Sequence, residues 1–364
     1  MTFRWPFKSK KPKHWVGINL STLTPSAVIY SDRGVVESVS FRSDDGIAAL
    51  ESWLQQHITH PIPAVLVLDD ADYELLLVEA PEVPDEELTA AIEFRIGDLL
   101  NQSVEETALQ AVRLPRDAYR GRMSMAHVVA SPNNVIKKWV DWAGQNNLRV
   151  NVITVPEFSL LNILSINNIN DGIAILDLGP SYGTIRLYQQ GALYLTRQVE
   201  VGLNALAIQP DDGTSQSEPE ENSEPLLLDE VEFNDGAESD FDTSLDELEA
   251  ELSTDVVDTY VGFAPKANVD TQQVDNLILE VQRSLDYYES QLGMGQITQL
   301  WVMANNIDLT PLVETMQPAL AANIEQPNIC KKLQQIDGIT MPVNDGDINE
   351  RITALGGALA YAAN

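Results

Sequence analysis

The chain has 364 residues, 44% of them apolar, and is therefore long enough for two or more domains with cores of their own. Its 55 acidic residues outnumber its 22 basic residues, and the net charge of −33 excludes a general nucleic-acid-binding protein, which needs a basic face. Cys330 is the only cysteine, which excludes an intrachain disulfide.

Residues 1–15 form a basic and aromatic arm, in which Trp5 and Phe7 stand beside several lysines. This composition suits peripheral contact with an anionic membrane surface, and an equally good alternative is a tail that docks on the protein's own domain. The lysines interrupt the apolar core that a secretory signal needs, and no run of 18 apolar residues occurs. The sequence therefore predicts a cytoplasmic protein.

Residues 16–70 have the pattern of the first half of an α/β domain. Apolar strands lie on both sides of a short turn between Val16 and Tyr30. Helical spacing then predicts a helix over Asp44–Gln56, and a continuous apolar run predicts a buried strand at Ala64–Leu68.

Residues 71–150 have the pattern of a small inserted α+β subdomain. The expected strands are Tyr73–Val78, Thr107–Pro115 and Ser124–Ala130, and the expected helices are Asp85–Leu100 and Asn133–Gln145. In the first helix the buried face is expected to comprise Leu88, Ile92, Ile96 and Leu99. Residues 151–172 then connect back to the first half through the rest of a strand, Val150–Val155, and a helix that begins at Pro156.

The second half begins at Ile173 and comprises residues 173–209 and 259–364. The intervening residues 210–258 carry 19 acidic side chains and no basic one. Charge repulsion and low hydrophobicity favour a disordered insertion, although leucine clusters leave short recognition helices as an alternative. Beyond it, the pattern predicts a long helix over Val274–Leu292, a strand over Gln299–Met303 and a C-terminal helix of small residues.

One pattern occurs twice and supplies the candidate site. Segments 16–30 and 173–188 each have an apolar strand, a turn of small and hydroxyl residues, and a second strand. Such turns present backbone N–H groups and hydroxyls to a phosphate. If the two turns face each other, the candidate ATP-binding residues are Asn19, Ser21, Thr22, Asp177, Gly179, Ser181 and Gly183.

Several short motifs follow one another along the chain. They are Gly17-Ile18-Asn19-Leu20-Ser21, Pro81-Glu82-Val83-Pro84, Leu176-Asp177-Leu178-Gly179, the segment 280–288, and Gly356-Gly357-Ala358-Leu359-Ala360. Their order and spacing resemble the PilM-type actin-like proteins of bacterial type IV pilus assembly, over nearly the whole chain except the arm and the acidic insertion. The resemblance implies an α/β fold of the actin/FtsA type, with duplicated ribonuclease H-like halves and an inserted α+β subdomain.

The same resemblance implies a cytoplasmic scaffold at the face of the inner membrane. Its implied partners are a PilN-like inner-membrane protein and the assembly ATPase. In that family the partner's cytoplasmic tail enters a groove beside the extra subdomain. We therefore expect a peptide groove on the subdomain at 70–150 and its junction with the first half, since the strand-rich sequence there suits an extended peptide.

Three departures weaken the ATP and Mg²⁺ expectation. Asn19 stands where actin-like ATPases usually have an aspartate that holds hydrated Mg²⁺, and Pro180 removes an N–H donor from the second turn. Residues 302–306 lack the glycine pair that the family has near the adenosine. These departures favour turns that only close hairpins, with Asp177 capping backbone groups. We expect no catalysis and no required cofactor.

Two other functions stay open. One is an active Mg-ATP-dependent enzyme of the actin/sugar-kinase superfamily, and the other is a secretion-system component related to GspL. No metal site is expected, because the four histidines, His14, His57, His60 and His127, show no ligand spacing with Cys330.

Overall fold

The computed structural model describes residues 14–42, 45–208, 270–305, 307–334 and 351–362. The expected acidic insertion at 210–258 and residues 1–13 of the basic arm lie outside this part of the chain. His14 and Trp15, which were expected in the arm, belong to the first strand. Trp15 is buried, and its Nε1 donates a hydrogen bond to the Ala358 carbonyl at 2.8 Å, so its ring is committed to the core.

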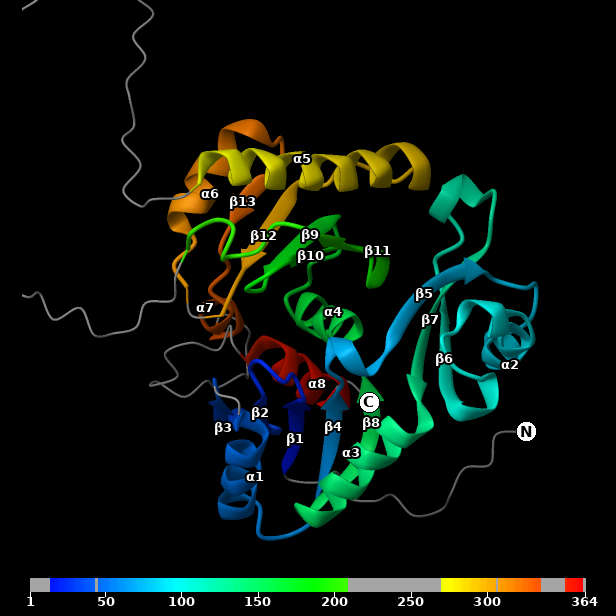
Figure 1. Cartoon of the computed structure of the whole chain (residues 1–364), viewed down its shortest axis with the longest axis vertical. Helices are drawn as coiled ribbons and strands as arrows, with labels where there is room; N and C mark the ends of the chain where they lie inside the picture. The colour runs from blue at the N-terminus through cyan, green and yellow to red at the C-terminus, as the bar shows by residue number, and fades with distance from the viewer. Residues whose placement is uncertain (1–13, 43–44, 209–269, 306, 335–350, 363–364) are drawn as a thin grey trace, which may run out of the picture. The chain divides into compact units, whose positions relative to one another are not determined.

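The first half is built on a five-stranded sheet with the order β3-β2-β1-β4-β8. Strands β1 (His14–Asn19), β2 (Ser26–Ser31) and β3 (Gly34–Ser40) are antiparallel neighbours, and β4 (Ile62–Val67) and β8 (Leu148–Thr154) continue the sheet in parallel. Helices α1 (Gly46–His57) and α3 (Asn133–Gln145) share one core with this sheet (Figure 1). Leu50, Leu54 and Trp139 are buried in that core.

The second half repeats this design with the sheet order β11-β10-β9-β12-β13. Its strands are β9 (Ile173–Leu178), β10 (Gly183–Gln189), β11 (Ala192–Val199), β12 (Gln299–Met303) and β13 (Asn323–Glu325). Its helices are α5 (Thr271–Tyr287), which continues as a π-turn to Leu292, α6 (Thr310–Met316) and α7 (Ile329–Gln334). The two candidate turns therefore occupy equivalent places, β1–β2 and β9–β10, in two sheets of the same topology.

A third sheet, of order β5-β7-β6, forms the inserted subdomain. It contains β5 (Glu74–Glu79), β6 (Thr107–Arg113) and β7 (Met125–Pro132), and α2 (Asp85–Ile96) covers one of its faces. Short 3₁₀ turns at 70–72, 97–99, 104–106 and 118–121 connect these elements. A further 3₁₀ turn at 317–319 follows α6 in the second half.

A C-terminal helix that is rich in small residues packs on the first sheet and on a second helix. Helix α8 (Ile352–Ala362) contacts β1, β2 and β4 of the first sheet as well as α4 (Pro156–Ile166). Gly17 makes the helix–strand contact possible, because a Cβ there would lie 2.0 Å from the Ala354 carbonyl oxygen. Gly356 does the same against α4, since its Cβ would lie 2.3 Å from the Ser159 carbonyl oxygen.

Two sequence expectations need correction. The sequence placed the end of the inserted unit at residue 150, but α3 and β8 belong to the first half, because β8 pairs with β4 and α3 packs in the core of the first sheet. The helix expected over Asp85–Leu100 ends at Ile96, and Leu99 lies in the following 3₁₀ turn with 58% of its surface exposed. Leu88, Ile92 and Ile96 are buried as expected.

Within the described residues, no helix combines the length and the apolar character that crossing a membrane requires.

Candidate functional site

The turn between β1 and β2 satisfies its own backbone N–H groups. Asn19 is buried, its Oδ1 accepts from the Ser21 amide at 3.4 Å, and its Nδ2 donates to the Thr24 carbonyl at 3.3 Å. The Thr22 amide donates to a carboxylate oxygen of Asp69, at the end of the segment that follows β4. The other oxygen of Asp69 accepts from the Ala71 amide at 2.9 Å. A carboxylate of the chain thus holds the amide that a phosphate oxygen would need.

The turn between β9 and β10 is closed by contacts of a similar kind. The Gly179 amide donates to the Tyr182 carbonyl at 3.0 Å, and the Gly179 and Pro180 carbonyls accept from the amides of Leu203 and Asn204. The chain at Gly202 is pressed onto this turn, since a Cβ there would lie 2.4 Å from the Ser181 backbone carbon. Ser181 is exposed, and Gly183 is buried at the start of β10.

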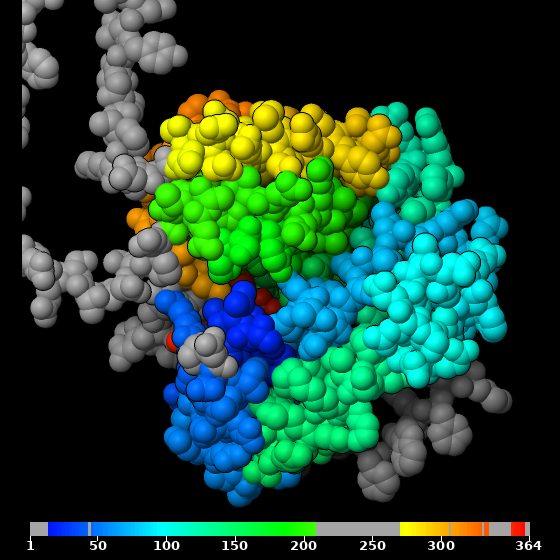
Figure 2. Space-filling model, viewed as in Figure 1, coloured from blue at the N-terminus to red at the C-terminus, as the bar shows by residue number. Residues whose placement is uncertain are grey.

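A hydrogen bond joins the neighbourhoods of the two turns. Asn305, which follows β12 of the second half, donates through Nδ2 to the Thr24 hydroxyl at 3.0 Å. Figure 2 shows a hollow between the blue surface of the first half and the green surface of the second, with α8 in dark red at its base. Among the described residues, no hydrogen bond runs directly from residues 19–22 to residues 177–183.

A buried polar cluster lies beside the second turn. The Arg186 guanidinium donates from Nε to Glu157 Oε1 at 3.2 Å, and its Nη1 lies 3.6 Å from Asp177 Oδ2. The side chains of Arg186 and Glu157 are 2% and 6% exposed, whereas that of Asp177 is 47% exposed. The Tyr73 hydroxyl donates to Glu157 Oε2 at 2.7 Å, and the Tyr188 hydroxyl donates to the Glu157 main-chain carbonyl at 2.9 Å.

The groups of this cluster stabilise one another's protonation states. Burial lowers the pKa of Arg186, but Glu157, Tyr188 and Asp177 raise it further than burial lowers it, so the guanidinium stays charged. Burial, with the nearby Glu157 carboxylate, raises the pKa of the Tyr73 hydroxyl and keeps it a donor. The cluster joins the inserted subdomain, α4 and the second sheet through Tyr73, Glu157 and Arg186.

Several backbone amides at the two turns that could donate to a phosphate already donate to acceptors within the chain. Asp69 already accepts from the Thr22 amide, Asn19 from the Ser21 amide, and Tyr182 from the Gly179 amide. Arg186 lies against both Glu157 and Asp177. No group of three or more His, Cys, Asp or Glu side chains within the described ranges could hold a metal ion.

A second feature is a groove of about 1010 Å³ between the inserted subdomain and the second half. Its floor is the face of the third sheet opposite α2. Its walls come from the loop before α2, from the segment between β6 and β7, from α4, and from the β10–β11 turn. The apolar residues that line it are Val83, Val112, Leu114, Met123, Phe158, Leu161 and Leu193. The sequence predicted a peptide groove on the subdomain at 70–150 and its junction with the first half; the present groove is lined by that subdomain and also by Gly191–Leu193 of the second half.

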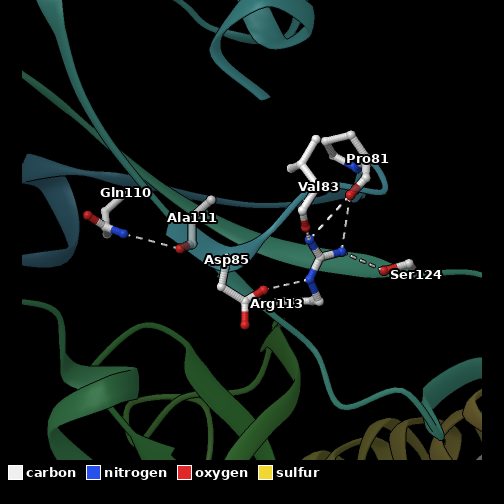
Figure 3. A network of polar contacts seen from close by, with 7 residues as sticks. All are labelled: Pro81, Val83, Asp85, Gln110, Ala111, Arg113 and Ser124. Atoms are coloured by element: carbon white, nitrogen blue, oxygen red, sulfur yellow. Dashed lines mark hydrogen bonds and ion pairs between the residues drawn. The ribbon is translucent and has the colours of Figure 1, made fainter. Parts of the chain in front are cut away.

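Arg113 shapes one wall of the groove (Figure 3). Its guanidinium donates to the Pro81 and Val83 carbonyls, to the Ser124 hydroxyl at 2.9 Å and to Asp85 Oδ1 at 2.9 Å. These bonds use all of its donor nitrogens. Arg113 therefore holds the Pro81–Pro84 loop in place and is not available to a ligand.

Arg116 is different, because it is exposed at the same groove and has no ion pair or hydrogen bond among the described residues. It offers a free cation to an occupant of the groove.

His127 lies under the groove at the middle of the third sheet. It is 4% exposed, and its Nε2 lies 3.2 Å from the Leu193 carbonyl oxygen, which fixes Nε2 as the donor in the neutral ring. Burial lowers the pKa of His127 to about 4, although the Leu193 carbonyl and Glu157 act in the opposite direction. The ring thus links the inserted subdomain to β11 as an uncharged donor.

This depressed pKa predicts a pH-dependent stability. Between its unfolded pKa of 6.5 and about 4, the unfolded chain binds a proton at His127 that the folded chain does not, so stability falls as the pH decreases through this window. The expected loss is about 3 kcal/mol at the acid end. Urea unfolding at pH 7 and pH 4.5 measures it. His127→Gln should remove this part of the slope, whereas the exposed His57→Gln should retain it; equal slopes in both variants would contradict the assignment.

The two halves with their paired hairpins have an actin-like fold. A solved structure described as the PilM-PilN type IV pilus biogenesis complex is similar over 97% of this chain and 98% of the other, with a TM-score of 0.60 and 14% identity. An archaeal actin homologue, Ta0583, covers 96% of this chain with all of its own length, at a TM-score of 0.38 and 9% identity. The cytoplasmic domain of EpsL, from the type II secretion system of Vibrio cholerae, is similar over 56% of this chain and 79% of its own length. Its TM-score is 0.38 and its sequence identity is 14%.

No protein-family model matches the sequence, and no curated protein sequence matches it either. The likeness is therefore one of fold, and the two halves with an inserted subdomain that the sequence predicted are confirmed at that level.

Sequence reasoning missed four residues that shape these sites: Glu157, Arg186, Arg113 and His127. A signal existed for Arg186, since it stands between the apolar residues Ile185 and Leu187 in a predicted strand. A buried charge in such a place needs a partner. The identity of the partner, 29 residues away along the chain, was not deducible from local pattern.

Proposed function

We propose that the protein is a non-enzymatic scaffold of a type IV pilus assembly platform, at the cytoplasmic face of the inner membrane. The fold likeness to the PilM-PilN complex and the order of the sequence motifs support this role. The motifs further favour the pilus of the mannose-sensitive haemagglutinin type, because their order resembles that of its biogenesis protein MshI. In this role the protein binds the cytoplasmic tail of a PilN-like membrane protein.

The groove is the observation that carries the proposal. An extended segment of several residues fits about 1010 Å³, and the exposed Val112 and Met123 offer apolar contacts to alternate side chains. Arg116 offers a charge-assisted bond to a carboxylate of the tail. The Arg113 bonds keep the Pro81–Pro84 wall ordered before the tail arrives, which limits the entropy cost of binding.

Further contacts belong to the same proposal. The assembly ATPase is a second partner, and the basic arm, whose residues 1–13 lie outside the described part of the chain, gives peripheral contact with the membrane. Both follow from the sequence resemblance and from the charge of the arm.

A peptide-binding measurement tests the groove. A fluorescent peptide with the sequence of the PilN-like tail is titrated with the full chain, and Val112→Asp and Met123→Asp are each expected to weaken its affinity tenfold or more, because an acid replaces an apolar contact. Leu99→Asp is the matched control, since Leu99 is 58% exposed in the turn after α2 and does not line the groove. Equal affinity in all three variants would reject the groove as the binding site.

A further inference from the structure

One anion and one cation of the chain itself lie beside the two paired hairpins. The anion is the Asp69 carboxylate, which bridges the Thr22 amide in the first turn and the Ala71 amide in the segment after β4. Backbone amides that donate to the two oxygens of one carboxylate group are an arrangement that also binds a phosphate group. A phosphate at the same amide would also be repelled by the negative charge of the carboxylate.

The cation is the Arg186 guanidinium. It lies between Glu157, at the start of α4, and Asp177, at the end of β9, and it is 2% exposed. Two carboxylates that converge from different elements repel each other unless a positive charge lies between them. A hydrated divalent ion is one such charge, and a fixed guanidinium is another that requires no ligand from solution.

We infer that Asp69 and Arg186 replace the phosphate and the divalent cation of a nucleotide complex, and that the protein keeps this site closed without nucleotide. The Asn305–Thr24 hydrogen bond adds a contact between the halves that involves no ligand. This inference is independent of the peptide groove, because it concerns the turns and predicts no change at Val112 or Met123.

The wild-type protein gives the first test. Differential scanning fluorimetry and calorimetry with millimolar Mg-ATP are expected to show no rise in Tm and no binding heat. A micromolar affinity, or a Tm that rises with Mg-ATP concentration, would overturn the inference.

Removing the internal cation gives the second test. Arg186→Gln is expected to lower Tm by about 10 °C, because Glu157 and Asp177 lose their shared counter-charge. Millimolar Mn²⁺ should restore part of this loss in Arg186→Gln and leave the wild type unchanged. Arg113→Gln is the matched control: it loses a hydrogen-bonded guanidinium beside a single carboxylate, Asp85, and should not respond to Mn²⁺. The absence of a Mn²⁺ response specific to Arg186→Gln would overturn the role assigned to the guanidinium.

Removing the internal anion gives a third test that does not depend on the folding of the Arg186 variant. Asp69→Ala frees the Thr22 and Ala71 amides at an exposed turn, and tripolyphosphate is expected to raise the Tm of this variant but not that of the wild type. Asp308→Ala is the control, since its carboxylate also accepts from a backbone amide, that of Thr310 at 2.9 Å. Equal responses in Asp69→Ala, Asp308→Ala and the wild type would show that Asp69 does not occupy an anion site.

Discussion

Replacing Gly17 with alanine is expected to lower the free energy of unfolding by about 3 kcal/mol or more, one of the two largest single effects in the chain. The added methyl group would lie 2.0 Å from the Ala354 carbonyl oxygen and 2.4 Å from the Ala358 amide nitrogen. Both are backbone atoms of α8, so no side-chain rotation relieves the clash. Helix α8 would have to move away from β1, and the contact between the Trp15 ring and the Ala358 carbonyl would be lost with it.

Chemical denaturation of Gly17→Ala measures this effect, and the chain offers a close control. Gly144 lies in α3 with no atom within 4 Å of an added Cβ. Alanine there should stabilise the protein by about 0.5–1 kcal/mol, because glycine costs more backbone entropy in a helix. A loss below about 1 kcal/mol for Gly17→Ala would mean that α8 does not pack on β1 as described.

The second large effect is expected from Glu157→Ala, with a loss of about 3–5 kcal/mol in the free energy of unfolding. The substitution leaves the 2% exposed Arg186 guanidinium without its main partner and leaves the Tyr73 hydroxyl without its closest acceptor. A charge left unpaired in the interior costs more than the pair contributed, because its desolvation is no longer offset.

Three comparisons separate the ion pair from the cavity that Glu157→Ala creates. Glu157→Gln keeps an acceptor for Tyr73 and should lose less stability than the alanine variant. The double variant Glu157→Gln, Arg186→Gln should lose less than the sum of its single variants, because the pair is coupled. Asp141→Ala breaks the exposed pair with Lys137 and should cost less than about 0.5 kcal/mol. Additive losses at Glu157 and Arg186 would contradict a buried, coupled pair.

Phe158 links the buried polar cluster around Glu157 to the groove. Phe158 follows Glu157 at the start of α4 and lines the groove. The hydrogen bonds of Glu157 with Arg186, Tyr73 and Tyr188 fix the start of α4, and with it the position of Phe158. The buried polar cluster and the groove are therefore neighbours at the first turn of α4.

The amino-acid sequence by itself determined the local structure of each half. The repeated strand–turn–strand pattern predicted the β1–β2 and β9–β10 hairpins, and helical spacing predicted α3 with the ends that the structure has, Asn133 and Gln145. These features depend on the period of apolar residues and on turn chemistry within a few residues, which a single sequence displays directly.

Only the tertiary structure decided which elements join which sheet and which charges meet. Strand β8 pairs with β4 although the whole inserted subdomain lies between them in the sequence. Helix α8, near the end of the chain, packs on β1, near its start. The partners of Arg186, the acceptors around Arg113 and the residues that line the groove come from segments far apart along the chain. Such contacts form where the chain buries its apolar surface and pairs its backbone hydrogen-bonding groups at the same time. The local spacing of apolar residues does not predict them.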